Sequence, residues 1–503
     1  MPDLLTPALP EIDVRPGALT DVLVDVDDPD LVLALPVGPD APLPTAGPVA
    51  AALSALGLDP AALTAAWEPS PKAGSLTRVP LVPGERGVRT LLLVGTGAGT
   101  PQDLRAAGAA VGRAVKDRSH LVTTLGSGAG VGATAAVVEG LVLGGYSTPR
   151  WGATEATAPV RSLTFAGRYD ERVLTRSALR CRATMLARNL AVTPSNIKNP
   201  AWMAAQARTL GRRHGLEVHV RSDADLRREG FGGLIAVGGG SATPPRLVEL
   251  TWTPEGAGDD TPHVVLVGKG ITFDTGGLDI KPAEAMLAMK TDMSGSAIVL
   301  AVLAACRDLE VPVRVTGLLA LAENAVSGSS YRPGDVISQY GGRRVEIGNT
   351  DAEGRLVMAD ALAYADAELD PDVLIDIATL TGAATLALGR GMAPLYATDE
   401  RLGRALQAAA TATGEPLWPF PLVEDYRAAI DSELADVNHI ASGKVGGGSI
   451  TAALFLREFV GGRRWAHLDI AGAGRSDKDS GHLTRGATGF GARLLLTYLE
   501  GVR

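Results

Sequence analysis

Short apolar runs alternate with amphipathic stretches along most of the chain, a pattern that predicts strands alternating with helices. From residue 200 onward the alternation is regular, and several apolar runs are nearly continuous. Such runs are typical of strands that helices cover on both faces. We therefore expect a mostly parallel, helix-covered sheet there. Its predicted strands are 234–237, 263–267, 313–319, 345–347, 373–377 and 465–470, and its predicted helices are 297–308, 356–369, 400–412 and 451–460.

The N-terminal third has the same pattern on a smaller scale. Its predicted elements are strands at 22–26 and 90–94, the first at a sheet edge, and a helix at 101–116. The pattern loosens around 151–168, and the next stretch, 171–190, has apolar residues at helical spacing. We therefore expect an α/β fold with a smaller N-terminal domain over 1–168, a connecting helix within 169–199 and a larger domain over 200–503.

Composition narrows the classes of function. No apolar run approaches the ~20 residues that span a bilayer, and the N-terminus lacks a signal-peptide pattern, so we expect a cytoplasmic protein without a membrane anchor. A net charge of -9 argues against a general nucleic-acid binder. Cys181 and Cys306 are the only cysteines, which excludes a disulfide framework and a cysteine-rich metal site. The seven histidines are scattered, so acids must supply the ligands if a metal binds.

Two carboxylates and a guanidinium lie close together in residues 349–356, whose sequence is NTDAEGRL. In an extended loop Asp351 and Glu353 point the same way, and the apolar residues that follow have helical spacing. The octet is thus a loop that leads into a helix. Paired carboxylates suit a hard metal ion or zinc. The alternative is an acidic turn stabilised by the helix dipole.

A second stretch adds further acids. Residues 268–282 read GKGITFDTGGLDIKP, and 289–293 read MKTDM, which brings in Asp274 and Asp292. Four carboxylates close together would repel one another and raise their pKa values, and two divalent cations would balance their charge. With DIATLTGA at 376–383, these motifs resemble the leucyl aminopeptidase (cytosol aminopeptidase) family of two-metal peptidases. The resemblance covers roughly residues 180 to 500, so it makes 200–503 the catalytic domain.

The resemblance implies a function and a ligand set. It implies a metal-dependent aminopeptidase that releases N-terminal residues, Leu and other apolar ones preferred, by attack of a hydroxide bridging two ions, Mn²⁺ or Zn²⁺. It also implies peptide substrates and a homohexamer. The implied ligands of one ion are Lys269, Asp274, Asp292 and Glu353, and those of the other are Asp274, Asp351 and Glu353. An ammonium has no lone pair, so Lys269 can coordinate only when a nearby dication and burial lower its pKa. Its alternative is a surface charge.

Other residues receive roles by the same resemblance. Lys281 would stay charged and stabilise an oxyanion, or else cap a loop. Arg355 would hold bicarbonate, which acts as the base, or else form a salt bridge to Glu353 or Asp351. The implied side-chain pocket consists of Met289, Thr379, Leu380 and Gly382, of which the last three are alternatively turn residues.

Two further functions compete with the peptidase. A two-metal phosphoesterase would need several basic residues converging on a phosphate, and near these motifs the sequence offers Lys281 and Arg355. A secondary DNA-binding role of the N-terminal domain is disfavoured by the acidic net charge. Asp279 stands where the resembling family usually has a small residue, and we expect it to face solvent.

Overall fold

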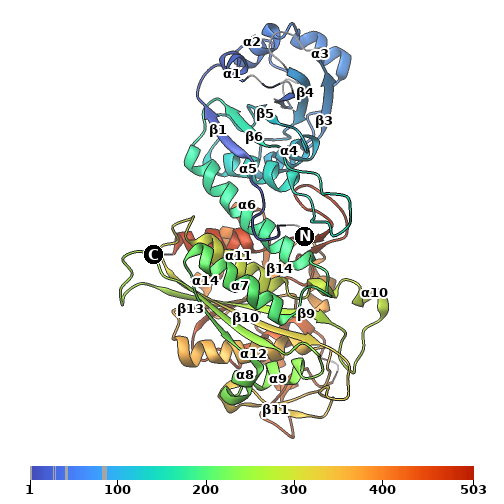
Figure 1. The fold of residues 1–503 in the computed structure, drawn as a ribbon, viewed down its shortest axis with the longest axis vertical. Coiled ribbons are helices and arrows are strands. Elements are labelled where there is room, and N and C mark those ends of the chain that lie inside the picture. Colours follow the sequence, from blue (N-terminus) through green and yellow to red (C-terminus); the bar gives the residue numbers. More distant parts are fainter. Residues whose placement is uncertain are drawn as a thin grey trace. The chain divides into compact units, whose positions relative to one another are not determined.

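The computed structural model describes residues 3–26, 28, 30–39, 43–81, 88–443 and 445–502. The chain forms two compact units, one of residues 1–185 with 478–485 and one of 186–477 with 486–503. Each unit has its own sheet with helices packed on it (Figure 1). A smaller N-terminal α/β unit and a larger C-terminal one confirm the predicted fold class. The predicted connecting helix is α6 (Glu171–Val192), which runs across the division.

The smaller unit contains a six-stranded sheet in the order β1-β6-β5-β2-β4-β3, parallel except for the pair β3 and β4. Its strands are β1 (Glu11–Arg15), β2 (Leu31–Val37), β3 (Leu76–Pro80), β4 (Val88–Gly95), β5 (His120–Thr123) and β6 (Ser162–Ala166). Its helices before α6 are α1 (Leu19–Asp25), α2 (Pro48–Ala55), α3 (Pro60–Trp67), α4 (Pro101–Ala114) and α5 (Val131–Gly145). The strand predicted at 90–94 and the helix predicted at 101–116 are confirmed as β4 and α4.

The edge strand predicted at 22–26 is wrong, because this stretch lies in helix α1. Leu19, Val22 and Leu23 are buried, and their separations of three and four residues place them on one helical face. The apolar run has the composition of a strand but the spacing of a helix. β6 also lies within 151–168, where the loosened pattern predicted no strand.

The larger unit contains an eight-stranded sheet in the order β15-β14-β17-β13-β9-β10-β8-β7. Its four central strands are parallel, whereas β8 runs antiparallel to β10 and β7, and β14 antiparallel to β17. The strands are β7 (Glu217–Arg221), β8 (Arg246–Trp252), β9 (His263–Asp274), β10 (Arg314–Asn324), β13 (Val373–Ala378), β14 (Ala393–Ala397), β15 (Leu417–Pro419) and β17 (Arg464–Asp469).

Helices cover both faces of this sheet (Figure 1), as the continuous apolar runs predict. One face carries α7 (Pro200–His214), α11 (Ser294–Cys306), α14 (Glu400–Thr413) and α16 (Ala492–Gly501). The other carries α8 (Asp223–Glu229), α9 (Gly232–Gly238), α12 (Glu353–Tyr364) and α15 (Gly448–Arg457). The strand predicted at 234–237 is wrong, because Leu234 and Val237 lie one turn apart on the buried face of α9.

Two details of the sheet differ from the prediction and decide where the site lies. β9 extends to Asp274, so Lys269 lies within a strand instead of following one. The strand predicted at 345–347 is β12 (Arg344–Glu346), which belongs to a separate three-stranded sheet with β11 (Val336–Ser338) and β16 (Val437–Asn438). β9 lies between β13 and β10, where the strand order reverses, and ligands bind at such switch points of α/β sheets.

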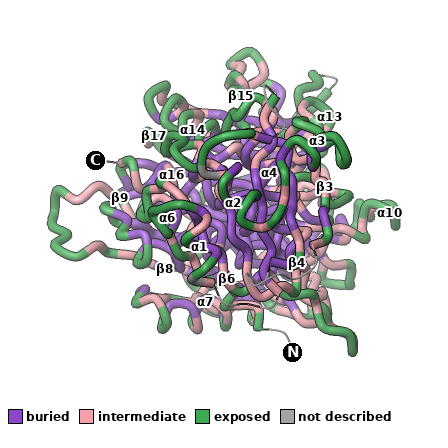
Figure 2. The backbone as a smooth tube through the Cα atoms, turned by 90° about the horizontal axis from the view of Figure 1, so that it is seen from above, coloured by how far each residue is buried: buried purple, intermediate pink, exposed green. Residues whose placement is uncertain are grey.

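The structure shows whether the most apolar segments of the chain are buried within the protein or exposed. Among the described residues, one segment, Ala283–Cys306, is long and apolar enough to cross a membrane, and the bent pair α2 and α3 passes the same test if it counts as one span. In the structure 67% of the apolar window of Ala283–Cys306 is buried within the protein, as in a core helix. The short helix α10 (Ala283–Met286) at its start is exposed, and Figure 2 draws it in green.

Candidate metal centre and active site

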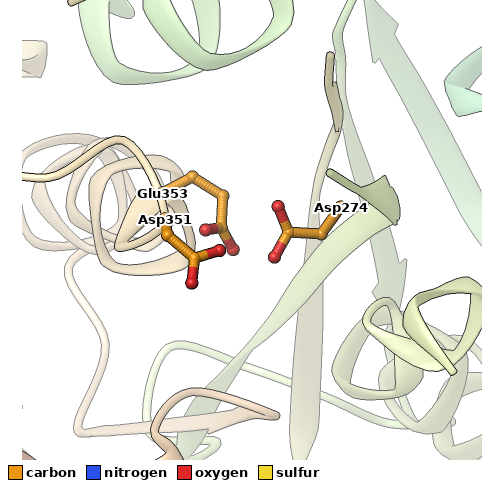
Figure 3. A group of neighbouring side chains, drawn as sticks. All are labelled: Asp274, Asp351 and Glu353. Atoms are coloured by element: carbon orange, nitrogen blue, oxygen red, sulfur yellow. The ribbon is translucent and has the colours of Figure 1, made fainter. Parts of the chain in front are cut away.

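Three carboxylates converge from two distant parts of the larger unit (Figure 3). Asp274 is the last residue of β9, Asp351 lies in the loop before α12, and Glu353 is the first residue of that helix. One oxygen of each lies within 4.8 Å of the other two. The side chains of Asp274 and Glu353 are 2% exposed, and that of Asp351 is 34% exposed. Clustered carboxylate oxygens with one open side are the donor set of a divalent cation that also contacts substrate.

Lys269 extends this cluster to a fourth acid. Its Nζ donates a hydrogen bond of 3.0 Å to Asp292 Oδ1 and lies 2.9 Å from Glu353 Oε1. The side chain is 3% exposed, which excludes the surface-charge alternative. Burial opposes the charged form, but the Asp292, Glu353 and Asp274 carboxylates together raise the pKa of Lys269 above its ordinary value. A neutral, coordinating Lys269 therefore requires the added positive charge of a dication.

The glycine of the octet has a steric function. A Cβ atom at Gly354 would lie 2.5 Å from Lys269 Cε and 2.7 Å from its Nζ. Glu353 and Lys269 can approach each other because the residue after Glu353 has no side chain. The sequence shows this glycine between an acid and a base but does not show which group it makes room for.

Three acids of the site, Asp274, Asp292 and Asp351, have raised pKa values, and burial is the largest cause for each of them. Burial raises the pKa of Asp274, and the charge of Glu353 adds to that rise. The pKa of Asp292 rises to about 8, with burial as the largest cause. Burial likewise raises the pKa of Asp351. Positive charge among these oxygens would offset the repulsion and keep the acids ionised.

The surroundings of one carboxylate oxygen indicate that the site is suited to a cation. Glu353 Oε2 is buried and has no hydrogen-bond partner among the residues that the structure describes. A buried acceptor without a partner costs about 1–3 kcal/mol. A cation bound between Glu353, Asp274 and Asp351 would supply that partner, so the donor set fits divalent metal ions.

Lys281 lies on the open side of the cluster. Its Nζ is 2.7 Å from Asp274 Oδ2 and forms a second ion pair with Asp351. Burial opposes the charged form, but the carboxylates raise the pKa of Lys281, so this lysine is charged. Asp279 is an exposed residue, as expected, but its Oδ2 also accepts a hydrogen bond of 2.7 Å from the backbone N–H of Thr350. This bond ties the loop that carries Lys281 to the loop that carries Asp351.

Arg355 lies in the first turn of α12 and is nearly buried. Its Nη1 donates a hydrogen bond of 2.7 Å to the backbone oxygen of His439, and its Nε has no partner in the described part of the chain. The expected alternative, a salt bridge to Glu353 or Asp351, does not occur among these residues. Burial lowers the pKa of Arg355 to about 10, which leaves it charged at neutral pH.

The four predicted pocket residues line the same cavity as the acids. Met289, Thr379, Leu380 and Gly382 share this cavity, of about 370 Å³, with Lys269, Asp274, Lys281, Asp292, Asp351 and Glu353. Residues 379–381 connect β13 to α13 (Gly382–Leu388), and the Thr381 side chain caps that helix. The loop thus has a structural role and also forms a wall of the cavity.

Three residues that support the site are not among the site residues predicted from the sequence. Asn324 ends β10, beyond the predicted strand, and its Nδ2 donates a hydrogen bond of 2.9 Å to Asp274 Oδ1. Asp469 ends β17 and accepts hydrogen bonds from the backbone of Leu380 and the hydroxyl of Thr381. The His439 ring contacts the backbone of Gly348 and of Asn349, the first residue of the octet. Asn324 and Asp469 are the last residues of their strands, and a polar residue at this position could have been predicted to lie at the edge of the sheet where the site is. The residues to which they form hydrogen bonds are distant in sequence and could not have been predicted.

Comparison with known proteins extends these observations. The sequence model of the catalytic domain of the cytosol aminopeptidase family matches residues 185–496, and that of the family's N-terminal domain matches residues 38–151. A probable cytosol aminopeptidase from Micrococcus luteus is 41% identical over 97% of this chain and 98% of its own length.

Two solved structures are similar over nearly the whole chain. A tomato leucine aminopeptidase mutant has a TM-score of 0.86 at 29% identity, over 98% of this chain and 97% of that one. The bottromycin maturation enzyme BotP in complex with Mn has a TM-score of 0.80 at 35% identity, over 94% of this chain and 99% of that one. The matches give no support to the phosphoesterase or DNA-binding alternatives.

Proposed function

Because this chain belongs to the cytosol aminopeptidase family and is a metal-dependent aminopeptidase, we propose that two divalent ions, Mn²⁺ or Zn²⁺, bind at the acid cluster of the larger unit. Lys269, Asp274, Asp292 and Glu353 would hold one ion, and Asp274, Asp351 and Glu353 the other. The observation that carries this proposal is the convergence of Asp274, Asp351 and Glu353, together with the buried Glu353 Oε2, which has no hydrogen-bond partner in the described part of the chain. The manganese in the BotP structure supports the choice of metal.

The metals would supply Lewis acidity and an activated water. The protein's own groups would do the rest. The free amine and scissile carbonyl of a peptide would enter the cavity beside Asp292 and Lys281, and this placement would orient the bond for attack. Lys281, held charged on the open side of the cluster, would donate to the oxygen on which negative charge develops.

Arg355 would hold the anion that moves the proton. Its Nε is unpartnered and its guanidinium has a fork of donors that matches a planar carbonate. With the site's carboxylates committed to metal, a bicarbonate held by Arg355 would accept the proton of the attacking water and pass it to the leaving amine. Addition of bicarbonate to enzyme prepared without carbonate would raise turnover in the wild type and leave Arg355→Ala unchanged.

The side-chain pocket favours apolar N-terminal residues. Met289 and Leu380 contribute apolar side chains to the lining of the cavity, and Thr379 and Gly382 contribute small residues. We therefore place Leu, Met and similar residues among the preferred N-terminal residues of its peptide substrates. We further propose a cytoplasmic homohexamer, in line with the family. Light scattering on the purified protein tests the hexamer.

The decisive experiment combines metal analysis with two substrates. Hydrolysis of leucine p-nitroanilide should proceed with two ions per chain, vanish after removal of the metal by a chelator, and return with manganese or zinc. p-Nitrophenyl phosphate should not be hydrolysed. Circular dichroism before and after chelation serves as the control for folding. Activity that survives complete removal of metal would overturn the proposal.

A further inference from the structure

The cavity that holds the acid cluster is also lined by two arginines that the proposed reaction does not use. Arg390 lies in the turn after α13, and Arg475 begins the short strand β18 (Arg475–Ser476). Their side chains are 35% and 30% exposed. Both therefore reach the cavity wall and remain open to solvent and to a bound molecule.

The two guanidiniums share one carboxylate. Arg390 Nε lies 3.0 Å from Asp477 Oδ2, and Arg475 Nη2 lies 3.5 Å from Asp477 Oδ1. Asp477 is the outermost of the three, with its side chain 66% exposed. Burial lowers the pKa of Arg475, and the nearby positive charge of Arg390 lowers it further. Two cations thus lie close together with one solvent-exposed acid between them.

Most hydrogen-bond donors of this pair are available. Each guanidinium has five N–H donors, and within the described ranges Asp477 is the one ion-pair partner found for either arginine. Among the residues lining the cavity, Glu284 on the exposed helix α10 is the acid that does not belong to the metal cluster. The planar fork of a guanidinium matches a carboxylate, which it binds through two parallel hydrogen bonds.

The arginines lie beside the predicted side-chain pocket. A Cβ atom at Gly474 would be 3.4 Å from Thr379 Cγ2, so the backbone that leads into Arg475 packs against a wall of that pocket. A carboxylate at the end of an N-terminal residue's side chain would therefore enter the cavity on the side where this pair lies. The carboxylate terminus of a short peptide is a second source of the same chemistry.

We propose that Arg390 and Arg475 form a carboxylate-binding subsite, through which the enzyme also accepts substrates whose N-terminal residue is Glu or Asp. The inference rests on the proposed aminopeptidase function and extends its apolar preference. The pair determines specificity and takes no part in bond cleavage.

The test compares substrates that differ by one charge. Glutamate p-nitroanilide is measured against glutamine p-nitroanilide, a neutral substrate of the same shape, and Leu-Gly against Leu-Gly amide for the C-terminal carboxylate. In Arg390→Gln and Arg475→Gln the Glu-to-Gln ratio of kcat/KM should fall about 10–100-fold, the loss expected for a charged hydrogen bond. Arg404→Gln, an exposed arginine on α14, is the matched control and should keep the wild-type ratio.

A ratio measured within one variant does not depend on the folded fraction of the preparation. Arg475→Glu gives an independent readout, since it should raise the preference for lysine p-nitroanilide over the glutamine substrate. A fall confined to the Leu-Gly to Leu-Gly amide ratio would retain the carboxylate subsite but overturn its assignment to the N-terminal side chain. Unchanged ratios in both variants would overturn the subsite. If the wild type hydrolysed none of these substrates, the proposed function itself would fail.

Discussion

The Thr379 hydroxyl donates a hydrogen bond of 2.8 Å to Asp292 Oδ1. The backbone oxygen of the same residue accepts a hydrogen bond of 2.9 Å from Lys269 Nζ. Thr379 thus orients two proposed metal ligands while its side chain lines the cavity. The side-chain pocket and the metal centre therefore share one structural element, the loop between β13 and α13.

Loss of the Thr379 hydroxyl should weaken metal binding. Thr379→Val keeps the shape of the side chain but removes the donor to Asp292, and groups that orient metal ligands typically contribute 10–100-fold in affinity, so we expect about that loss. Thr379→Ser keeps the hydroxyl and serves as the control. Competition with a chelator measures the affinity. Equal metal affinity in the two variants would contradict this role of Thr379.

Removal of Glu353 should abolish activity and lower the metal content. Glu353→Ala deletes a carboxylate that would bind both ions, and it leaves the Lys269 ammonium with one ion-pair partner fewer. Metal analysis per chain should show loss from the proposed two ions, and Asp351→Ala should behave similarly. Glu400→Ala, at an exposed position on α14, is the control. Full metal occupancy in Glu353→Ala would show that this residue is not a ligand.

Lys281 should affect turnover without affecting metal content. Lys281→Met removes the cation beside Asp274 and should cost roughly 2.7–4 kcal/mol of transition-state stabilisation, a loss in kcat of about 10²–10³-fold. Steady-state kinetics and metal analysis of the same preparation measure both quantities. Lys72→Met, at an exposed position in the smaller unit, provides the comparison. A nearly normal turnover number in Lys281→Met would remove Lys281 from the reaction.

The His439 ring should make stability depend on acidity. It is buried, its Nδ1 accepts from the backbone N–H of Gly348 at 3.2 Å, and its Nε2 lies 2.8 Å from the backbone oxygen of Asn349. Nδ1 also lies 3.1 Å from the backbone oxygen of Glu346, so each ring nitrogen lies within hydrogen-bond distance of a carbonyl oxygen. Burial, with the charge of Arg355, lowers the pKa of His439 to about 4.

The direction of the effect follows from the lowered pKa. An unfolded histidine takes up its proton near pH 6.5, so the unfolded chain binds more protons than the folded one between about pH 6.5 and 4. The free energy of unfolding should therefore fall on acidification through this range, by at most about 3 kcal/mol from His439. Urea unfolding at pH 7 and pH 5 should show a smaller difference for His439→Gln than for the wild type or for His219→Gln at an exposed position. An equal difference in all three would contradict the prediction.

Local sequence predicted some elements well and others poorly. The strand at 373–377 and the helix at 101–116 have patterns long or apolar enough to define their type. The runs at 22–26 and 234–237 are four or five residues long, and a run of that length fits a buried helical turn as well as a strand. Tertiary packing decided between the two, because it placed these residues on a helical face against the sheet.

The sequence by itself determined which groups carry the chemistry. Their types and local spacings, such as Asp351 and Glu353 before a helix, follow from a few neighbouring residues. Only the tertiary structure decided which atoms meet: that Lys269 within β9 reaches Thr379, 110 residues away, and that Asn324 supports Asp274, 50 residues away. Covalent geometry sets the distance between residues that are close in sequence. Strand pairing and the packing of α12 against the sheet bring together residues that are far apart in sequence. That is why a motif identifies the donors of a site and the fold alone determines its geometry.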